Sequence, residues 1–410
     1  MKTSIIHLIL ISLLVCSSCD LQQSDIQNEI EVTEKAALLI EAENDFGFEL
    51  FRDVYAVEKD AENIMLSPLS VSLALAMTYN GAAGETKTAM EKTLKVYGLT
   101  PGDINKSYYD LVNALKTLDP KVLLEIANAI YYRKDFTVEN SFVKTNQQYY
   151  NAEISALDFS SPLALNTING WVAEKTHNKI KTILEEIKPS HVMFLLNAIY
   201  FKGIWAKEFN SKSTVPQPFY FENGTSIQTE TMHRPDTLPY SSNSLFSAIQ
   251  LSYGKGNYNI YVFLPGPGKK LWDIVEKLDA ENWETWMKSF SKTQNVDIKL
   301  PKFKYEYEIN LNDVLTKMGM GVSFTGAADF TGINRAGGLR IDYVRHKTFI
   351  EVNEEGTEAA AVTIVAIDKT SAGGPQKVPF YVNRPFLYVI TEKSTGAVLF
   401  MGTVKNPNGD

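Results

Sequence analysis

Residues 354–371 read Glu-Glu-Gly-Thr-Glu-Ala-Ala-Ala-Val-Thr-Ile-Val-Ala-Ile-Asp-Lys-Thr-Ser, and the two halves of this stretch differ in character. From Thr357 to Ile367 the residues are small, β-branched or apolar, which is typical of a buried strand. From Asp368 to Lys377 the residues favour a loop. One interpretation is a core strand followed by a surface turn. A loop of this length inside a compact domain is uncommon and usually functional or disordered, which favours a functional segment.

The beginning of the stretch carries very little side-chain bulk. Alternation puts Thr357, Ala359, Ala361, Thr363, Val365 and Ile367 on one face and Glu358, Ala360, Val362, Ile364, Ala366 and Asp368 on the other. Because no bulky apolar residue precedes Val362, the segment could slide between two strands without a clash. The same small side chains bury little apolar area wherever the segment starts. The pattern is therefore typical of a segment with two alternative positions.

A family resemblance begins at these residues. The run Glu354, Glu355, Gly356, Thr357, Glu358, Ala359, Ala360 and Ala361 closely resembles the hinge of the inhibitory serpins. Further blocks resemble the same family in the same order, at residues 63–90, 197–205, 380–390 and 399–402. The resemblance extends over roughly residues 43–408, in several separate blocks. The resemblance implies an α+β serpin fold, with about nine helices around three β-sheets and an exposed reactive-centre loop at about residues 354–378.

The hydrophobic pattern predicts the main elements of one domain over residues 43–410. Strands are expected at Val122–Tyr132, Val192–Phe201, Val296–Tyr307 and Arg340–Val352, and a helix at Leu271–Met287. The composition, 44% hydrophobic and 21% charged over 410 residues, is ordinary for a globular protein. The formal net charge of −8 argues against nucleic acid or an anionic membrane surface as the main partner.

The amino terminus predicts export. Lys2 precedes a short apolar run, so residues 1–18 are interpreted as a signal peptide of the lipoprotein type. Cys16-Ser17-Ser18-Cys19 resembles a bacterial lipobox, which would make Cys19 the lipidated first residue; a plain secretory signal is the alternative. Residues 19–42 predict a flexible tether, although the apolar run from Ala36 can already begin the first helix. We expect a monomer anchored by lipid to a bacterial outer membrane or cell surface, or also released.

Motifs of catalysis are missing from the sequence. Both cysteines, Cys16 and Cys19, lie in the targeting segment, so the folded domain has no disulfide, thiol nucleophile or cysteine metal site. There is no Gly-x-Ser-x-Gly or His-Glu-x-x-His motif, and the five histidines lack metal-ligand spacing. A catalytic triad formed by residues far apart in the sequence stays an alternative at this point. We expect a protein that is not an enzyme and that uses no metal or cofactor.

The resemblance also implies roles for residues outside the loop. A polar cluster beneath the point where the large sheet opens would act as a latch, and it matches Ser67, Ser70, Asn197 and His346. Residues at the top of the opening match Trp205, Lys302 and Glu354, of which Lys302 and Glu354 would form a pair. By residue type alone, His346 on a strand is more often structural than catalytic.

The mechanism implied is that of a suicide substrate for serine proteases. The usual loop length of the family places the cut between Thr370 and Ser371, which suits an elastase-like or subtilisin-like protease. Lys369, one residue earlier, suits a trypsin-like pocket, whose Asp prefers a cation. The alternative within the family is a non-inhibitory serpin acting as a carrier or chaperone. From other classes, an exported hydrolase or a surface binding lipoprotein stays open.

Overall fold

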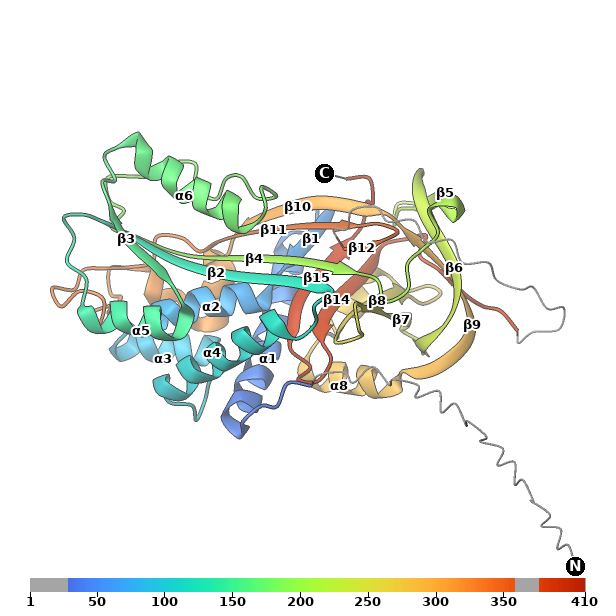
Figure 1. The fold of residues 1–410 in the computed structure, drawn as a ribbon, viewed down its shortest axis with the longest axis horizontal. Coiled ribbons are helices and arrows are strands. Elements are labelled where there is room, and N and C mark those ends of the chain that lie inside the picture. The colour runs from blue at the N-terminus through green and yellow to red at the C-terminus, as the bar shows by residue number, and fades with distance from the viewer. Residues whose placement is uncertain (1–28, 358–375, 410) are drawn as a thin grey trace, which may run out of the picture.

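The computed structural model describes residues 29–357 and 376–409, which form a mixed α and β structure (Figure 1). Its α-helices are α1 Glu34–Val57, α2 Pro68–Tyr79, α3 Gly84–Thr93, α4 Pro101–Thr117, α5 Asn140–Tyr150, α6 Pro162–Lys175, α7 Leu271–Val275, α8 Ala280–Ser289 and α9 Asn312–Leu315. Its strands are β1 Asn63–Leu66, β2 Val122–Arg133, β3 Glu153–Leu157, β4 Met193–Ile204, β5 Val215–Tyr220, β6 Ser226–Ser242, β7 Phe246–Tyr253, β8 Tyr258–Pro265, β9 Ser291–Pro301, β10 Phe303–Asn310, β11 Arg345–Val352, β12 Gly356–Thr357, β13 Val378–Tyr381, β14 Phe386–Glu392 and β15 Val398–Val404.

The larger sheet has nine strands. Its order is β1-β15-β14-β8-β7-β6-β9-β13, and β5 pairs with β6 to one side. Every residue of β14 and β15 is buried, so these strands lie in the core. The pairing of β6 with β9 shifts register between Asp236 and Leu238. This irregularity divides the β6–β9 pair into two parts, one beside β5 and β13 and the other beside β7. The third sheet expected from the sequence is therefore continuous with this sheet.

The smaller sheet has the order β10-β11-β12-β4-β2-β3. β2 and β4 pair along almost their whole length. β12 is only two residues long, and it pairs antiparallel with β11 on one side and β4 on the other. β4 and β11 therefore run parallel to one another. Within the described ranges no ladder joins β4 directly to β11, so β12 is their backbone link.

Helices cover both faces of the smaller sheet. α2 is apolar almost all round and buried along nearly its full length, as expected for a core helix, and it contacts β4 and β15 between the two sheets. α6 packs Ile168 and Trp171 against Phe194 and Leu196 of β4 on the opposite face. Figure 1 shows α6 on one side of β2 and β4 and α2 on the other. An additional strand between β4 and β11 would thus lie between α6 and α2.

Three predicted element boundaries are corrected by the structure. The strand predicted from Arg340 begins only at Arg345, which pairs with Asn310, the last residue of β10. The strand predicted over Val296–Tyr307 is two strands in different sheets, β9 and β10, separated at Lys302. The helix predicted over Leu271–Met287 is divided into α7 and α8.

The predicted tether is also too long. α1 begins at Glu34, where the Thr33 hydroxyl caps the helix by accepting a hydrogen bond from the Ala36 amide at 3.2 Å. Leu39 and Ile40 are buried in the main core. A tether that reaches residue 42 is therefore wrong, because residues 34–42 belong to the folded domain. The signal peptide and Cys19 lie outside the described residues. No helix within the described part of the chain is long and apolar enough to cross a membrane.

Candidate functional site

The hinge enters the smaller sheet at β12. Thr357 pairs with Gly203 and with Val352, and its hydroxyl lies 2.6 Å from the Tyr253 hydroxyl. Gly356 has φ +153°, and a Cβ there would lie 2.0 Å from the carbonyl oxygen of Gly203, so only glycine fits. The hinge therefore begins as a short strand already placed between β11 and β4.

The turn before β12 is held by Asn353 and Trp205. The Asn353 side-chain oxygen accepts hydrogen bonds from the amides of Glu355 and Gly356 at 3.0 and 3.3 Å. The Trp205 indole donates to the Asn353 carbonyl at 2.9 Å, and its backbone amide donates to the Glu355 carbonyl at 2.8 Å. The indole stacks on Tyr253 with ring centroids 4.6 Å apart. These contacts fix where the hinge leaves β11.

Glu354 lies at the top of the opening with two partners. Its carboxylate lies 3.0 Å from Lys302 Nζ and accepts a hydrogen bond from the Thr214 hydroxyl at 2.7 Å. Burial would raise the pKa of Glu354, but the hydrogen bonds and the Lys302 charge hold that pKa below its ordinary value. The neighbouring Glu355 has a raised pKa because of its burial and because of the nearby Glu208 and Glu354 charges.

The predicted latch residues lie deeper in the sheet. The Ser67 amide donates to His346 Nε2 at 3.0 Å, and the Ser67 hydroxyl accepts from the Ser70 amide at 3.2 Å as the N-cap of α2. Burial lowers the pKa of His346 to about 4, so its ring is neutral at pH 7 and can accept that hydrogen bond. Asn197 instead donates to the side-chain oxygen of Asn128 at 2.8 Å. The four residues predicted to form a latch thus lie in two hydrogen-bonded groups rather than in one network.

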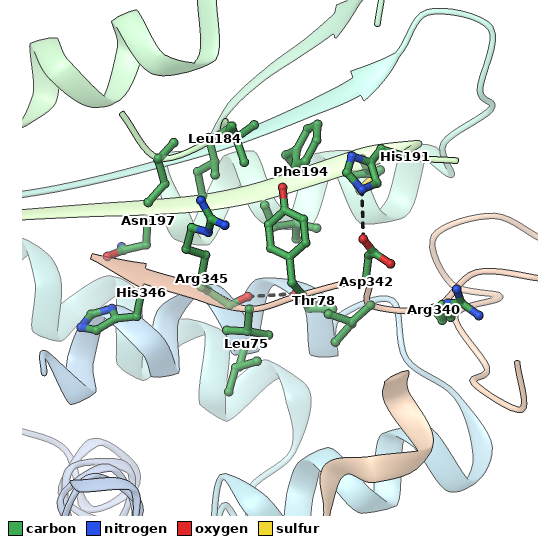
Figure 2. A pocket seen from close by; sticks show the side chains of 18 of the residues that line it. Leu75, Thr78, Leu184, His191, Phe194, Asn197, Arg340, Asp342, Arg345 and His346 are labelled. Atoms are coloured by element: carbon green, nitrogen blue, oxygen red, sulfur yellow. Dashed lines mark hydrogen bonds and ion pairs between the residues drawn. The ribbon is translucent and has the colours of Figure 1, made fainter. Parts of the chain in front are cut away.

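A cavity of about 420 Å³ lies below β12, between β4 and β11. Ser70, Asn197 and His346 line it together with apolar residues of α2, β4 and the segment before β11. In Figure 2, Leu75 and Thr78 come from α2, Phe194 and Asn197 from β4, and Arg345 and His346 from β11. The Asn197 side-chain oxygen is buried without a hydrogen-bond partner among the described residues. The cavity lies where a continuation of β12 would run.

The structure thus locates part of the predicted site. The predicted residues that lie around the opening between β4 and β11 are residues 354–357, Ser67, Ser70, Asn197, Trp205, Lys302 and His346. The predicted residues that lie outside the described ranges are Glu358, Ala359, Ala360, Ala361, Lys369, Thr370 and Ser371. Sequence reasoning missed the contact of Tyr253 with the hinge, because Tyr253 comes from the other sheet and no sequence pattern links it to Thr357.

The groups around this opening are suited to hydrogen bonding with a peptide strand. The site offers backbone donors and acceptors of β4 and β11, apolar walls and a few neutral polar side chains. In the described part of the chain, no group of three His, Cys, Asp or Glu side chains could hold a metal ion. A peptide strand would satisfy the backbone groups that face each other across the opening.

Comparisons with known proteins agree with this geometry. The profile of the family described as serpin (serine protease inhibitor) matches residues 41–407. The chain is 34% identical to Iris of Ixodes ricinus over 367 residues, which is 88% of this chain and 97% of that protein. Its fold is similar to the native state of the thermophilic serpin tengpin, with a TM-score of 0.82 and 35% identity over 92% of this chain and 96% of that one.

A second similar structure belongs to a protein that is named for binding a ligand. Human thyroxine-binding globulin complexed with thyroxine has a TM-score of 0.82 and 28% identity, over 92% of this chain and all of that one. The fold predicted from the hinge is therefore confirmed. From the family profile and from its relatives, this chain belongs to the serpin family, whose members are generally protease inhibitors rather than enzymes.

Proposed function

We propose that the protein is a suicide-substrate inhibitor of serine proteases that traps the acyl-enzyme by inserting its cleaved loop into the smaller sheet. The observation that carries this proposal is β12. Thr357 already pairs with both β4 and β11, and Gly356 pairs with β4, while β4 and β11 form no ladder with each other in the described chain. Insertion would therefore extend a strand that has already begun at Thr357.

The residues that follow suit this path. In an inserted strand that continues the register of Thr357, Thr363 would lie level with Asn197 and His346. Between Thr357 and Val362 the sequence has Glu358 followed by three alanines, which are small enough to pass between two strands. Each new strand hydrogen bond contributes about 0.5–1.5 kcal/mol net, so about a dozen inserted residues would stabilise the protein by on the order of 10 kcal/mol.

The covalent step supplies the trigger. The protease serine attacks the carbonyl of the reactive residue, the peptide bond to Ser371 breaks, and the protease histidine protonates the new amino group. The inhibitor stays joined to the protease serine through an ester at its new carboxyl end. Insertion then competes with attack of water on that ester. If insertion finishes first, the protease is carried to the far end of the sheet and distorted.

The reactive residue sets which proteases are trapped. Thr370 has a small side chain and suits an elastase-like or subtilisin-like pocket, whereas Lys369 suits a trypsin-like pocket. Cleavage after Lys369 shortens the inserted strand by only one residue. We therefore expect both protease classes to be inhibited through a covalent complex.

The test is to mix residues 20–410 separately with an elastase-like protease and with trypsin, followed by denaturing electrophoresis. A band at the summed mass is expected, and sequencing the released peptide identifies the cut. The hinge variant Thr357→Arg should lose this band, because Thr357 is 3% exposed and an arginine cannot enter β12. The matched variant Thr117→Arg, at the exposed carboxyl end of α4, should keep it. Cleavage without the band in the unmodified protein would refute inhibition.

A carrier function is the second candidate, and the likeness to thyroxine-binding globulin complexed with thyroxine favours it. A carrier need not insert its loop after cleavage. Clean cleavage, with no covalent band and no rise in thermal stability, would support this candidate.

We further propose that Cys19 carries a lipid that anchors the exported protein to a bacterial membrane. The support is the resemblance of residues 16–19 to a lipobox after a signal peptide. Metabolic labelling with a radioactive fatty acid should mark the unmodified protein and not the Cys19→Ser variant. Equal labelling of both, or of neither, would contradict this proposal.

A further inference from the structure

A side-chain contact in the wall of the cavity lies just before the first residues of β4 and β11. His191 lies two residues before β4, and Asp342 lies three residues before β11. His191 Nε2 and Asp342 Oδ2 are 3.0 Å apart, the contact drawn as a dashed line in Figure 2. The Lys188 amide donates to His191 Nδ1 at 3.1 Å, so the neutral ring carries its proton on Nε2 and donates it to Asp342. The contact joins the ends of two strands that form no ladder with each other among the described residues.

Aromatic contacts strengthen this junction. The His191 ring contacts Phe194 with ring centroids 5.2 Å apart and Tyr343 with centroids 5.7 Å apart, both edge to face. Phe194 and Tyr343 also contact each other at 6.4 Å. His191 is 6% exposed, so its hydrogen bond is largely shielded from water, although the Asp342 side chain is 42% exposed. We call this group of side chains the foot clasp; its members are His191, Phe194, Asp342 and Tyr343.

The register of β12 locates the foot clasp on the insertion path. If the loop were inserted in the register of Thr357, Ile367 would lie level with Met193 and Asp342, and Lys369 would lie level with His191. The foot clasp thus lies at the last rungs before the predicted cut. Neighbouring strands lie about 4.8 Å apart, so an inserted strand would hold β4 and β11 about twice that distance apart. The inserted residues need the space that the foot clasp occupies.

We propose that the foot clasp holds the end of the sheet closed until the final rungs of insertion, and that its opening limits how fast the protease is displaced. This inference rests on the proposed function. Earlier rungs would form without disturbing His191 or Asp342. The last rungs would require the His191–Asp342 contact to break while water competes for the ester. His191 and Asp342 are therefore positioning residues that set the outcome of the competition.

The test compares Asp342→Ala with Asp158→Ala. Asp158 is a matched control because its side chain is also 42% exposed and pairs with Lys134 at 2.7 Å, but this pair joins the ends of the neighbouring strands β2 and β3. Each variant is studied uncut and after cleavage of its loop by a metalloprotease, which forms no acyl-enzyme. Two quantities are measured: the melting temperature of each form, and the limiting rate constant of protease inactivation at saturating inhibitor.

We expect Asp342→Ala to lower the melting temperature of the uncut form by about 1–2 °C and to leave the cleaved form unchanged, because the contact is already broken there. The limiting rate constant should rise about two- to fivefold. Asp158→Ala should affect both forms alike and leave the rate unchanged. Asp342→Asn, which keeps a weaker hydrogen bond from His191, should give a smaller change of the same sign.

The two proposals fail in different ways. If the unmodified protein gains no stability on cleavage, insertion does not occur and the proposed function is wrong. If cleavage stabilises the protein but Asp342→Ala destabilises both forms equally, or leaves the rate unchanged, the contact is merely structural and the foot clasp proposal is wrong.

Discussion

In the nine-stranded sheet, backbone hydrogen bonds join each strand to the next from β1 to β13, whereas in the six-stranded sheet β12 alone links β4 to β11 within the described chain. The first sheet contains β14 and β15, which are buried at every residue. The second contains a cavity of about 420 Å³ beside neutral polar side chains. If the proposed function holds, the comparison teaches that stability and conformational change are assigned to different sheets, since a strand can be inserted inside a sheet only between two strands that are not yet paired.

The largest expected effect is on the open sheet. Cleavage of the loop should raise the free energy of unfolding by on the order of 10 kcal/mol, because an added strand supplies about a dozen hydrogen bonds. The denaturant midpoints of the uncut and cleaved forms measure this gain. Thr357→Arg should remove most of it by blocking the first rung, which is buried. Equal midpoints for the two forms of the unmodified protein would remove the distinction between the sheets.

A core substitution in the closed sheet should act on both forms. Leu387 is fully buried in β14 and pairs with Phe263 and Thr403. Leu387→Ala should cost about 2–5 kcal/mol of unfolding free energy through lost burial and the cavity left behind. Denaturation of the uncut and cleaved variant should show the same loss. A loss confined to the uncut form would mean that the closed sheet also rearranges.

The third prediction concerns Glu43 of α1, which is 2% exposed and has no hydrogen-bond partner for either carboxyl oxygen in the described chain. Burial raises its pKa to about 8. The unfolded chain loses this proton from about pH 4.5, so stability falls as pH rises from 4.5 to 8. Glu43→Gln should raise the free energy of unfolding by about 2–4 kcal/mol at pH 8 and by little at pH 4. Thermal unfolding across this range tests it, and a gain independent of pH would contradict a buried neutral carboxyl.

His346 in the open sheet should show the opposite pH dependence. Its pKa of about 4 lies below the ordinary value near 6.5, so its contribution is full above pH 6.5 and is lost as pH falls to 4. The loss should reach about 2–3 kcal/mol in the uncut form. His346→Gln, which can still accept from the Ser67 amide, should lack this slope. An unchanged slope would mean that His346 does not titrate in this range.

The smallest effect is expected at the top of the opening. Lys302→Ala removes the 3.0 Å ion pair with Glu354 but leaves the hydrogen bond from Thr214. Because the Lys302 side chain is 39% exposed, the free energy of unfolding should fall by no more than about 1 kcal/mol. This loss should occur only in the uncut form. Thermal unfolding of Lys302→Ala beside Lys302→Arg measures it. A loss several times larger would show that the pair controls the opening.

Much of the fold followed from hydrophobic runs. The strand predicted at Val122–Tyr132 was nearly that observed, because buried residues alternate with more exposed ones over its first half and buried residues follow to Tyr131. The strand predicted from Arg340 was too long, because extended residues become a strand only beside a partner, and β10 ends level with Arg345. The split at Lys302 was missed for a related reason: the Lys302 amide donates to the Glu230 carbonyl, where the chain passes from one sheet to the other.

The sequence by itself determined the hinge and its requirements. Gly356 and the small residues after it are properties of residue type, and local sterics restrict which side chains can pass between strands. Only the tertiary structure decided which side chains contact the hinge and line the opening. Tyr253 comes from the other sheet, and the contact of His191 with Asp342 joins residues 151 positions apart. Such contacts depend on packing distant segments together, and no local pattern records that geometry.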